Sequence, residues 1–78
     1  MEKNALRELL GKVLGIDPDT ITDDMSPESV ESWDSFNGLM IVTELEKYFN
    51  ISFTVDEVIN VKNVGDIERT LKARGLEF

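Results

Sequence analysis

The sequence predicts a small all-α protein, a four-helix bundle with three longer helices, a short third helix and a long first loop. Apolar residues recur at helical spacing in separate segments, and no segment alternates apolar and polar residues for long enough to indicate a strand. The 78 residues suffice for one modest core, so we expect a single domain over residues 1–78. Because cysteine is absent, that fold has to rest on burying apolar side chains.

The first predicted helix has one apolar side, formed by Leu6, Leu9, Leu10, Val13 and Leu14. Gly15 can end this helix in a left-handed conformation, and Pro18 keeps Asp17 out of the helical region. A long connection follows, from residue 16 to about residue 33. Within it the sequence Ser-Pro-Glu-Ser at residues 26–29 has the pattern of a cap and a proline in a first helical turn, which predicts a short turn.

The second predicted helix begins after Asp34, whose carboxylate can cap it, and runs to Phe49. At about 100° per residue two apolar sides appear. The side expected to face the core holds Gly38, Ile41, Val42, Leu45, Tyr48 and Phe49. The other side, adjacent to Ser35, holds Phe36, Leu39, Met40 and Thr43, which we call the apolar strip. The core does not need this strip, and Trp33 is expected to lie in the core or to anchor the loop.

Two further helices follow. Thr54 and Glu57 have the spacing of a capping box, which predicts a short third helix containing Val58 and Ile59. Asn63 can cap a last helix that ends at Gly75, with basic residues in its last turn. Its expected core residues are Val64, Ile67, Leu71 and, beyond its end, Leu76.

The charge is unevenly distributed. Sixteen acids and eight bases give a net charge of −8, and residues 13–46 contain nine acids and neither Lys nor Arg. Such a field repels nucleic acid and attracts basic protein surfaces. No apolar run near the N-terminus has the length of a signal peptide or a membrane span, so we expect a soluble cytoplasmic protein without a membrane partner.

Composition also argues against catalysis by this chain. Histidine and cysteine are both absent, which removes the usual general base and the soft metal ligands. Asp17, Asp19, Asp23 and Glu28 match four positions of a calcium-loop template. Ile21 and Thr22 occupy the places of a required oxygen ligand and the turn glycine, so no metal site is predicted.

The remaining candidate is Ser35. Free amides and the positive end of the second helix would stabilise a phosphate attached to its hydroxyl. Local physics alone favours a simpler interpretation, in which Asp34 caps the helix and Ser35 is merely exposed.

The surrounding residues carry a family resemblance. Asp34-Ser35-Phe36, preceded by Trp33, is similar to the Asp-Ser-Leu attachment motif of the acyl and peptidyl carrier proteins. The resemblance covers nearly the whole chain, including the leucine helix, the acidic connection, residues 51–53 and residues 64–67. It implies that Ser35 carries 4′-phosphopantetheine transferred from coenzyme A by a magnesium-dependent phosphopantetheinyl transferase, and that Asp34 helps this transferase to bind. It also implies partners that load and transfer acyl groups.

Two departures from the family pattern refine this expectation. Phe36 replaces the usual leucine, and the first half of the second helix lacks the acids of fatty-acid-synthesis carriers. The chain is therefore expected to be a freestanding, monomeric acyl carrier of a specialised pathway, making a polyketide, a modified lipid or a polysaccharide. An aminoacyl or peptidyl carrier, and a helical interaction module without a prosthetic group, remain as alternatives.

Overall fold

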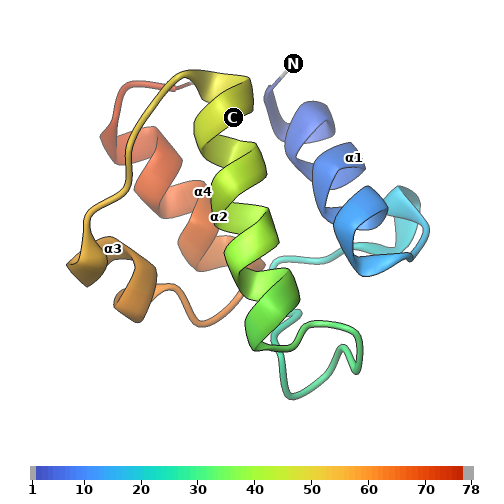
Figure 1. The fold of residues 1–78 in the computed structure, drawn as a ribbon. Coiled ribbons are helices and arrows are strands. Elements are labelled where there is room, and N and C mark those ends of the chain that lie inside the picture. Colours follow the sequence, from blue (N-terminus) through green and yellow to red (C-terminus); the bar gives the residue numbers. More distant parts are fainter. Residues whose placement is uncertain (1, 77–78) are drawn as a thin grey trace.

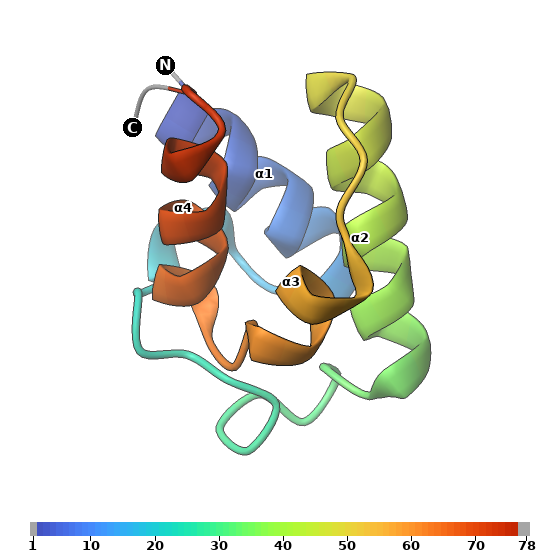
Figure 2. The ribbon, with the colours of Figure 1, turned by 90° about the vertical axis from the view of Figure 1, so that its left-hand side faces the viewer.

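The computed structural model describes residues 2–76, which form four α-helices and one 3-10 turn (Figure 1). In chain order they are α1 (Glu2–Leu14), η1 (Pro18–Thr20), α2 (Ser35–Phe49), α3 (Val55–Asn60) and α4 (Val64–Ala73). No strand occurs among these residues. Figure 2 shows α4 and α2 on opposite sides of the molecule, with α1 and the short α3 between them. The predicted all-helical class and the long first connection are confirmed.

The helix ends follow from their capping residues. The side chains of Asp34, Thr54 and Asn63 each accept a hydrogen bond from a backbone amide of the helix that follows, and Thr54 completes its capping box with Glu57. Gly15, with φ of 70°, follows the end of α1, as the sequence predicts. The capping residues therefore set where α2, α3 and α4 begin, and Gly15 marks where α1 ends.

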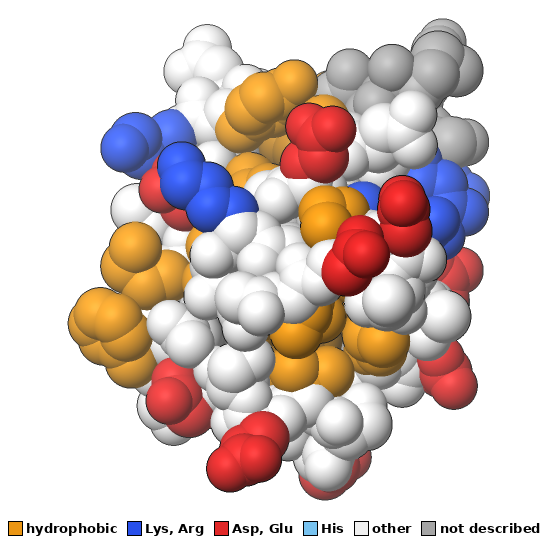
Figure 3. Space-filling model, turned by 90° about the vertical axis from the view of Figure 1, so that its right-hand side faces the viewer, with side chains coloured by type: hydrophobic (Ala, Val, Ile, Leu, Met, Phe, Trp, Pro, Cys, Tyr) orange, Lys and Arg blue, Asp and Glu red, His pale blue; other side chains and the backbone are white. Residues whose placement is uncertain are grey.

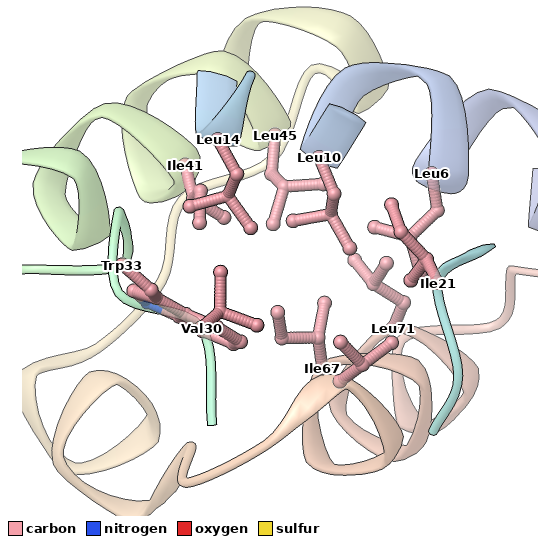
Figure 4. Close-up of a cluster of buried hydrophobic side chains, with 11 residues drawn as sticks. Leu6, Leu10, Leu14, Ile21, Val30, Trp33, Ile41, Leu45, Ile67 and Leu71 are labelled. Atoms are coloured by element: carbon pink, nitrogen blue, oxygen red, sulfur yellow. The ribbon is translucent and has the colours of Figure 1, made fainter. Parts of the chain in front are cut away.

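The core lies between α1, α2, α4 and the long connection (Figure 4). Its buried apolar side chains are Leu6, Leu10, Leu14, Ile21, Val30, Trp33, Ile41, Leu45, Val64, Ile67 and Leu71. Leu9, Val13, Phe49 and Leu76 are partly buried against this cluster. The predicted core faces of α1 and α4 are therefore confirmed.

The predicted core position of Tyr48 is wrong, because 62% of this residue is exposed. Its ring contacts Phe49 edge to face, with the ring centroids 4.9 Å apart, and borders a shallow groove against Leu9 and Val13 of α1. On α2 the core contacts are concentrated in the middle of the helix, at Ile41 and Leu45. Tyr48 shares their side of the helix but stays exposed, whereas the next residue, Phe49, is partly buried against the core.

The long connection packs against the bundle. Ile21 and Val30 are buried, and the carbonyl oxygens of Asp23 and Met25 accept hydrogen bonds from the first amides of α4, at 2.8 and 3.0 Å. Residues 26–29 form a single hydrogen-bonded turn. None of the helices in residues 2–76 is long and apolar enough to cross a lipid bilayer.

Candidate functional site

Ser35 is the first residue of α2, and Asp34 positions it there. The Asp34 carboxylate accepts a hydrogen bond of 2.8 Å from the Asn37 amide, and the Asp34 carbonyl accepts one of 2.8 Å from Gly38. Ser35 is exposed, and in the described chain its hydroxyl has no hydrogen-bond partner. The predicted cap is confirmed, and it leaves the serine hydroxyl open to solvent at the positive end of the helix.

Hydrogen bonds to α1 and to α2 hold the segment that leads to Ser35. The Ser32 hydroxyl donates to the carbonyl of Leu14 at the end of α1, at 2.7 Å. The Ser32 carbonyl accepts from the side-chain amide of Asn37, also at 2.7 Å. Trp33 is 7% exposed and belongs to the core. These contacts fix the backbone immediately before the site.

The apolar strip lies on the surface beside Ser35. Phe36 and Leu39 are 70% and 63% exposed, and Met40 is 36% exposed. Thr43 is also exposed, and its hydroxyl donates to the Leu39 carbonyl. Figure 3 shows a face on which exposed hydrophobic side chains, some of them at its left edge, lie among several acids. Exposed apolar groups of this kind make the strip a candidate contact surface.

A second group of exposed apolar residues lies on α3 and was not singled out from the sequence. Val55 and Ile59 are 74% and 66% exposed, and Val58 is 36% exposed. The signal was present, because Val58 and Ile59 follow the predicted capping box, but six residues are too few to show which side faces the core.

A groove of about 380 Å³ lies between α2, α3, α4 and the long connection, and Ser35 is one of its lining residues. Most of its lining is apolar, and the lining residues are Pro27, Trp33, Ser35, Gly38, Leu39, Ile41, Val42, Leu45, Phe53, Glu57, Val58, Val61 and Ile67. Val42, predicted for the core, is half-buried and borders this groove. A group attached to the Ser35 oxygen therefore meets solvent on one side and an apolar channel on the other.

Glu57 fixes one wall of the groove. It forms an ion pair with Arg74, which follows the end of α4, and Arg74 also lies 5.3 Å from the centre of the Phe53 ring. The hydrogen bond from Arg74 lowers the pKa of Glu57, and the backbone amide of Thr54 lowers it further. Glu57 therefore stays ionised and ties α3 to the end of α4.

The acids of the connection do not gather around a common point. Asp17 instead caps η1, with its carboxylate 2.9 Å from the Asp19 amide. Within residues 2–76 there is no group of three or more acidic side chains that could hold a metal ion.

Fold and site together define a small helical domain of the carrier-protein type, with an exposed serine at a helix start and exposed apolar side chains beside it. Solved structures share this fold. A protein assigned as an acyl carrier protein from Mycobacterium tuberculosis is 24% identical, with a TM-score of 0.85 over 95% of this chain and 99% of that one. The holo acyl carrier protein of Nitrosomonas europaea is 25% identical, with a TM-score of 0.78 over 95% of each chain. That of Geobacter metallireducens is 23% identical, with a TM-score of 0.76 over 97% and 93%.

A comparison with curated protein sequences gives no significant match. The family described as "phosphopantetheine attachment site" matches residues 4–71, most of the chain. The chain belongs to this family of acyl and peptidyl carrier proteins, whose covalent cofactor is 4′-phosphopantetheine.

Proposed function

We propose that the Ser35 hydroxyl is the attachment point of 4′-phosphopantetheine, and that residues 1–78 act as a single, monomeric, non-catalytic acyl carrier domain in the cytoplasm. The observation that carries this proposal is the exposed Ser35 hydroxyl, without a hydrogen-bond partner in the described chain, at the first position of α2. The amides of that first turn suit a phosphodiester, because they are oriented outwards and lie at the positive end of the helix.

The chain's own residues have defined tasks in loading. Asp34 holds the first turn in shape, so that Ser35 faces the phosphopantetheinyl transferase. The Ser35 oxygen forms the new bond to phosphorus and gives up its proton, while the nucleotide part of coenzyme A leaves. When attached, 4′-phosphopantetheine supplies a terminal thiol on which a carboxylic acid is carried as a thioester. The groove beside Ser35 offers this arm an apolar wall.

Partner enzymes are proposed to recognise the apolar strip of Phe36, Leu39, Met40 and Thr43. The acidic connection attracts basic enzyme surfaces and so increases the association rate, whereas the exposed apolar side chains prolong the bound state. These partners are the transferase and the enzymes that load and transfer acyl groups.

The pathway is proposed to be a specialised one, making a polyketide, a modified lipid or a polysaccharide. The first turn of α2 contains no acid, and Leu39 and Met40 are exposed on the next turn. The contact surface of a partner that fits here has to be more apolar than that of a partner that recognises an acidic helix. Loading by an adenylating enzyme, as in an aminoacyl or peptidyl carrier, is the alternative that uses the same site.

The attachment is tested by intact mass after incubation with coenzyme A and a broad-specificity phosphopantetheinyl transferase. The expected result is one added phosphopantetheinyl group on the wild-type chain and on Ser52→Ala, a control at another exposed serine, and none on Ser35→Ala. Addition to Ser35→Ala would overturn the attachment site. No addition to any of the three would favour an interaction module without a prosthetic group.

A further inference from the structure

The indole nitrogen of Trp33 is a hydrogen-bond donor without a partner in the described chain. Trp33 is 7% exposed and belongs to the core, yet its Nε1 makes no hydrogen bond within residues 2–76. Figure 4 shows the ring at one end of the core cluster, with this nitrogen in blue. Because the N–H of a buried tryptophan normally donates to an acceptor, an unpartnered one points to a group that binds beside it.

The nitrogen lies beside the groove that Ser35 also lines. Trp33 and Gly38 are both lining residues of this groove. A Cβ atom built on Gly38 would lie 3.7 Å from Nε1 and 4.0 Å from Cδ1 of the indole. The ring therefore turns its N–H edge, rather than its larger apolar edge, towards the bare backbone of Gly38 in the first turn of α2.

Neither backbone conformation nor crowding requires a glycine at position 38. Gly15 and Gly75 have positive φ angles, whereas Gly38 does not. The Gly38 amide makes an ordinary helical hydrogen bond to the Asp34 carbonyl, and both distances to an added Cβ are normal van der Waals contacts. Alanine would therefore fit, and it would favour the helix by about 1 kcal/mol. What the glycine provides is open space beside Nε1.

The rest of the groove wall offers a ligand little to bond with. Among its lining residues only Trp33, Ser35 and Glu57 have polar side chains. Glu57 accepts hydrogen bonds from Arg74 and from the Thr54 amide. Attachment of a phosphate to the Ser35 oxygen removes its proton. The Trp33 N–H is then the one side-chain donor left among these residues, in a wall that is otherwise apolar.

We propose that Nε1–H of Trp33 donates a hydrogen bond to an amide carbonyl of the phosphopantetheine arm, and that Gly38 keeps this donor uncovered. The inference rests on the proposed attachment at Ser35. Amide groups lie between the phosphate and the thiol of the arm, and their carbonyl oxygens are good acceptors. Ser35 follows Trp33 by two residues, so the part of the arm nearest the phosphate enters the groove beside the indole. Trp33 is thus a positioning residue, which holds the arm against the groove wall.

Nuclear magnetic resonance of the indole N–H tests the contact directly, because the chain has a single tryptophan and therefore one indole signal. Loading is taken to completion, and intact mass verifies one phosphopantetheinyl group, with a free thiol, on wild type, Gly38→Ala and Lys47→Ala. On loading, the wild-type indole proton should shift downfield and exchange with solvent roughly two- to tenfold more slowly, the range that one hydrogen bond contributes. Gly38→Ala, whose Cβ fills the space beside Nε1, should show a ratio near one. Lys47→Ala, at an exposed position of α2 outside the groove, should behave as wild type.

The arm itself gives a second measurement, because the chain has no cysteine and the thiol of the arm is the only thiol of the loaded protein. An arm that leaves the groove more often should react faster with a disulfide reagent. The rate should rise roughly two- to tenfold in Gly38→Ala and in Trp33→Phe, which keeps an aromatic ring but has no donor. Lys47→Ala should react at the wild-type rate.

The outcomes separate this contact from the attachment. An unchanged indole signal and exchange rate on a wild-type chain that carries the added mass would overturn the hydrogen bond and leave the attachment at Ser35 standing. Absence of the added mass would overturn the attachment and the hydrogen bond together. Equal slowing of exchange in Gly38→Ala and wild type would overturn the role of Gly38.

Discussion

The side-chain amide of Asn37 donates a hydrogen bond of 2.7 Å to the carbonyl oxygen of Ser32. Its backbone amide donates at the same time to the Asp34 carboxylate, at 2.8 Å. Asn37, in the first turn of α2, therefore holds two of the residues that precede this helix, and Ser32 also bonds Leu14 at the end of α1. The position of Ser35 is set by its neighbours rather than by contacts of its own.

Asn37→Ala should destabilise the fold by about 1 kcal/mol, because the partly buried Ser32 carbonyl loses its partner. Urea unfolding measures this change. Asn4→Ala, at an exposed position of α1, is the control and should leave the unfolding midpoint unchanged. Equal stability of Asn37→Ala and wild type would show that the hydrogen bond to Ser32 contributes nothing to the stability of the fold.

Asp34→Ala should lower the stability by about 1 kcal/mol through loss of the N-cap, while Asp34→Asn should leave it nearly unchanged, because asparagine caps equally well. The pair separates two roles of this residue. If the transferase recognises the charge of Asp34, the asparagine variant should be loaded more slowly despite its normal stability. Loading of Asp34→Asn at the wild-type rate would limit Asp34 to its capping role.

Met40→Glu should slow acyl transfer by partner enzymes at least about fivefold, as for an interface residue that contributes more than about 1 kcal/mol to binding. Its effect on stability should be small, because the side chain is already accessible to solvent. Asn4→Glu adds the same charge away from the site and should transfer at the wild-type rate. An unchanged rate for Met40→Glu with every partner tested would remove the docking role of the apolar strip.

Glu57→Gln should change the acid sensitivity of the fold. The pKa of Glu57 is lowered in the folded chain, so its contribution to stability is present above the ordinary value of 4.5 and is lost as the pH falls through the lower value. The stability difference between wild type and Glu57→Gln should therefore shrink as the solution is acidified, measured by thermal unfolding across the pH range. Asp56→Asn, in the same first turn of α3, is the control. A difference that does not vary with pH would contradict the ion pair with Arg74.

The helix starts were predictable because each depends on one residue and its immediate neighbours. Asp34, Thr54 and Asn63 all cap as their spacing indicates. Tyr48 was misplaced because a helical period gives the side on which a residue lies but not which residues of that side the neighbouring elements cover.

The burial of Glu68 was out of reach for a related reason. Glu68 follows Ile67 on α4, and a glutamate there is normally exposed. Its burial depends on where residues 23–25 cross α4, and two backbone hydrogen bonds between distant segments fix that crossing. The same holds for the groove at Ser35, whose walls come from α2, α3 and α4. Contacts between distant segments leave no recognisable pattern in the local sequence.

The chain has a single tryptophan, and Trp33 both belongs to the core and borders the groove that Ser35 also lines. Its indole emission therefore comes from one known position two residues before Ser35. Occupation of the groove changes the polarity around that ring and should shift the emission wavelength. The protein thus contains an intrinsic optical reporter with which prosthetic-group loading can be followed in real time, without an added dye.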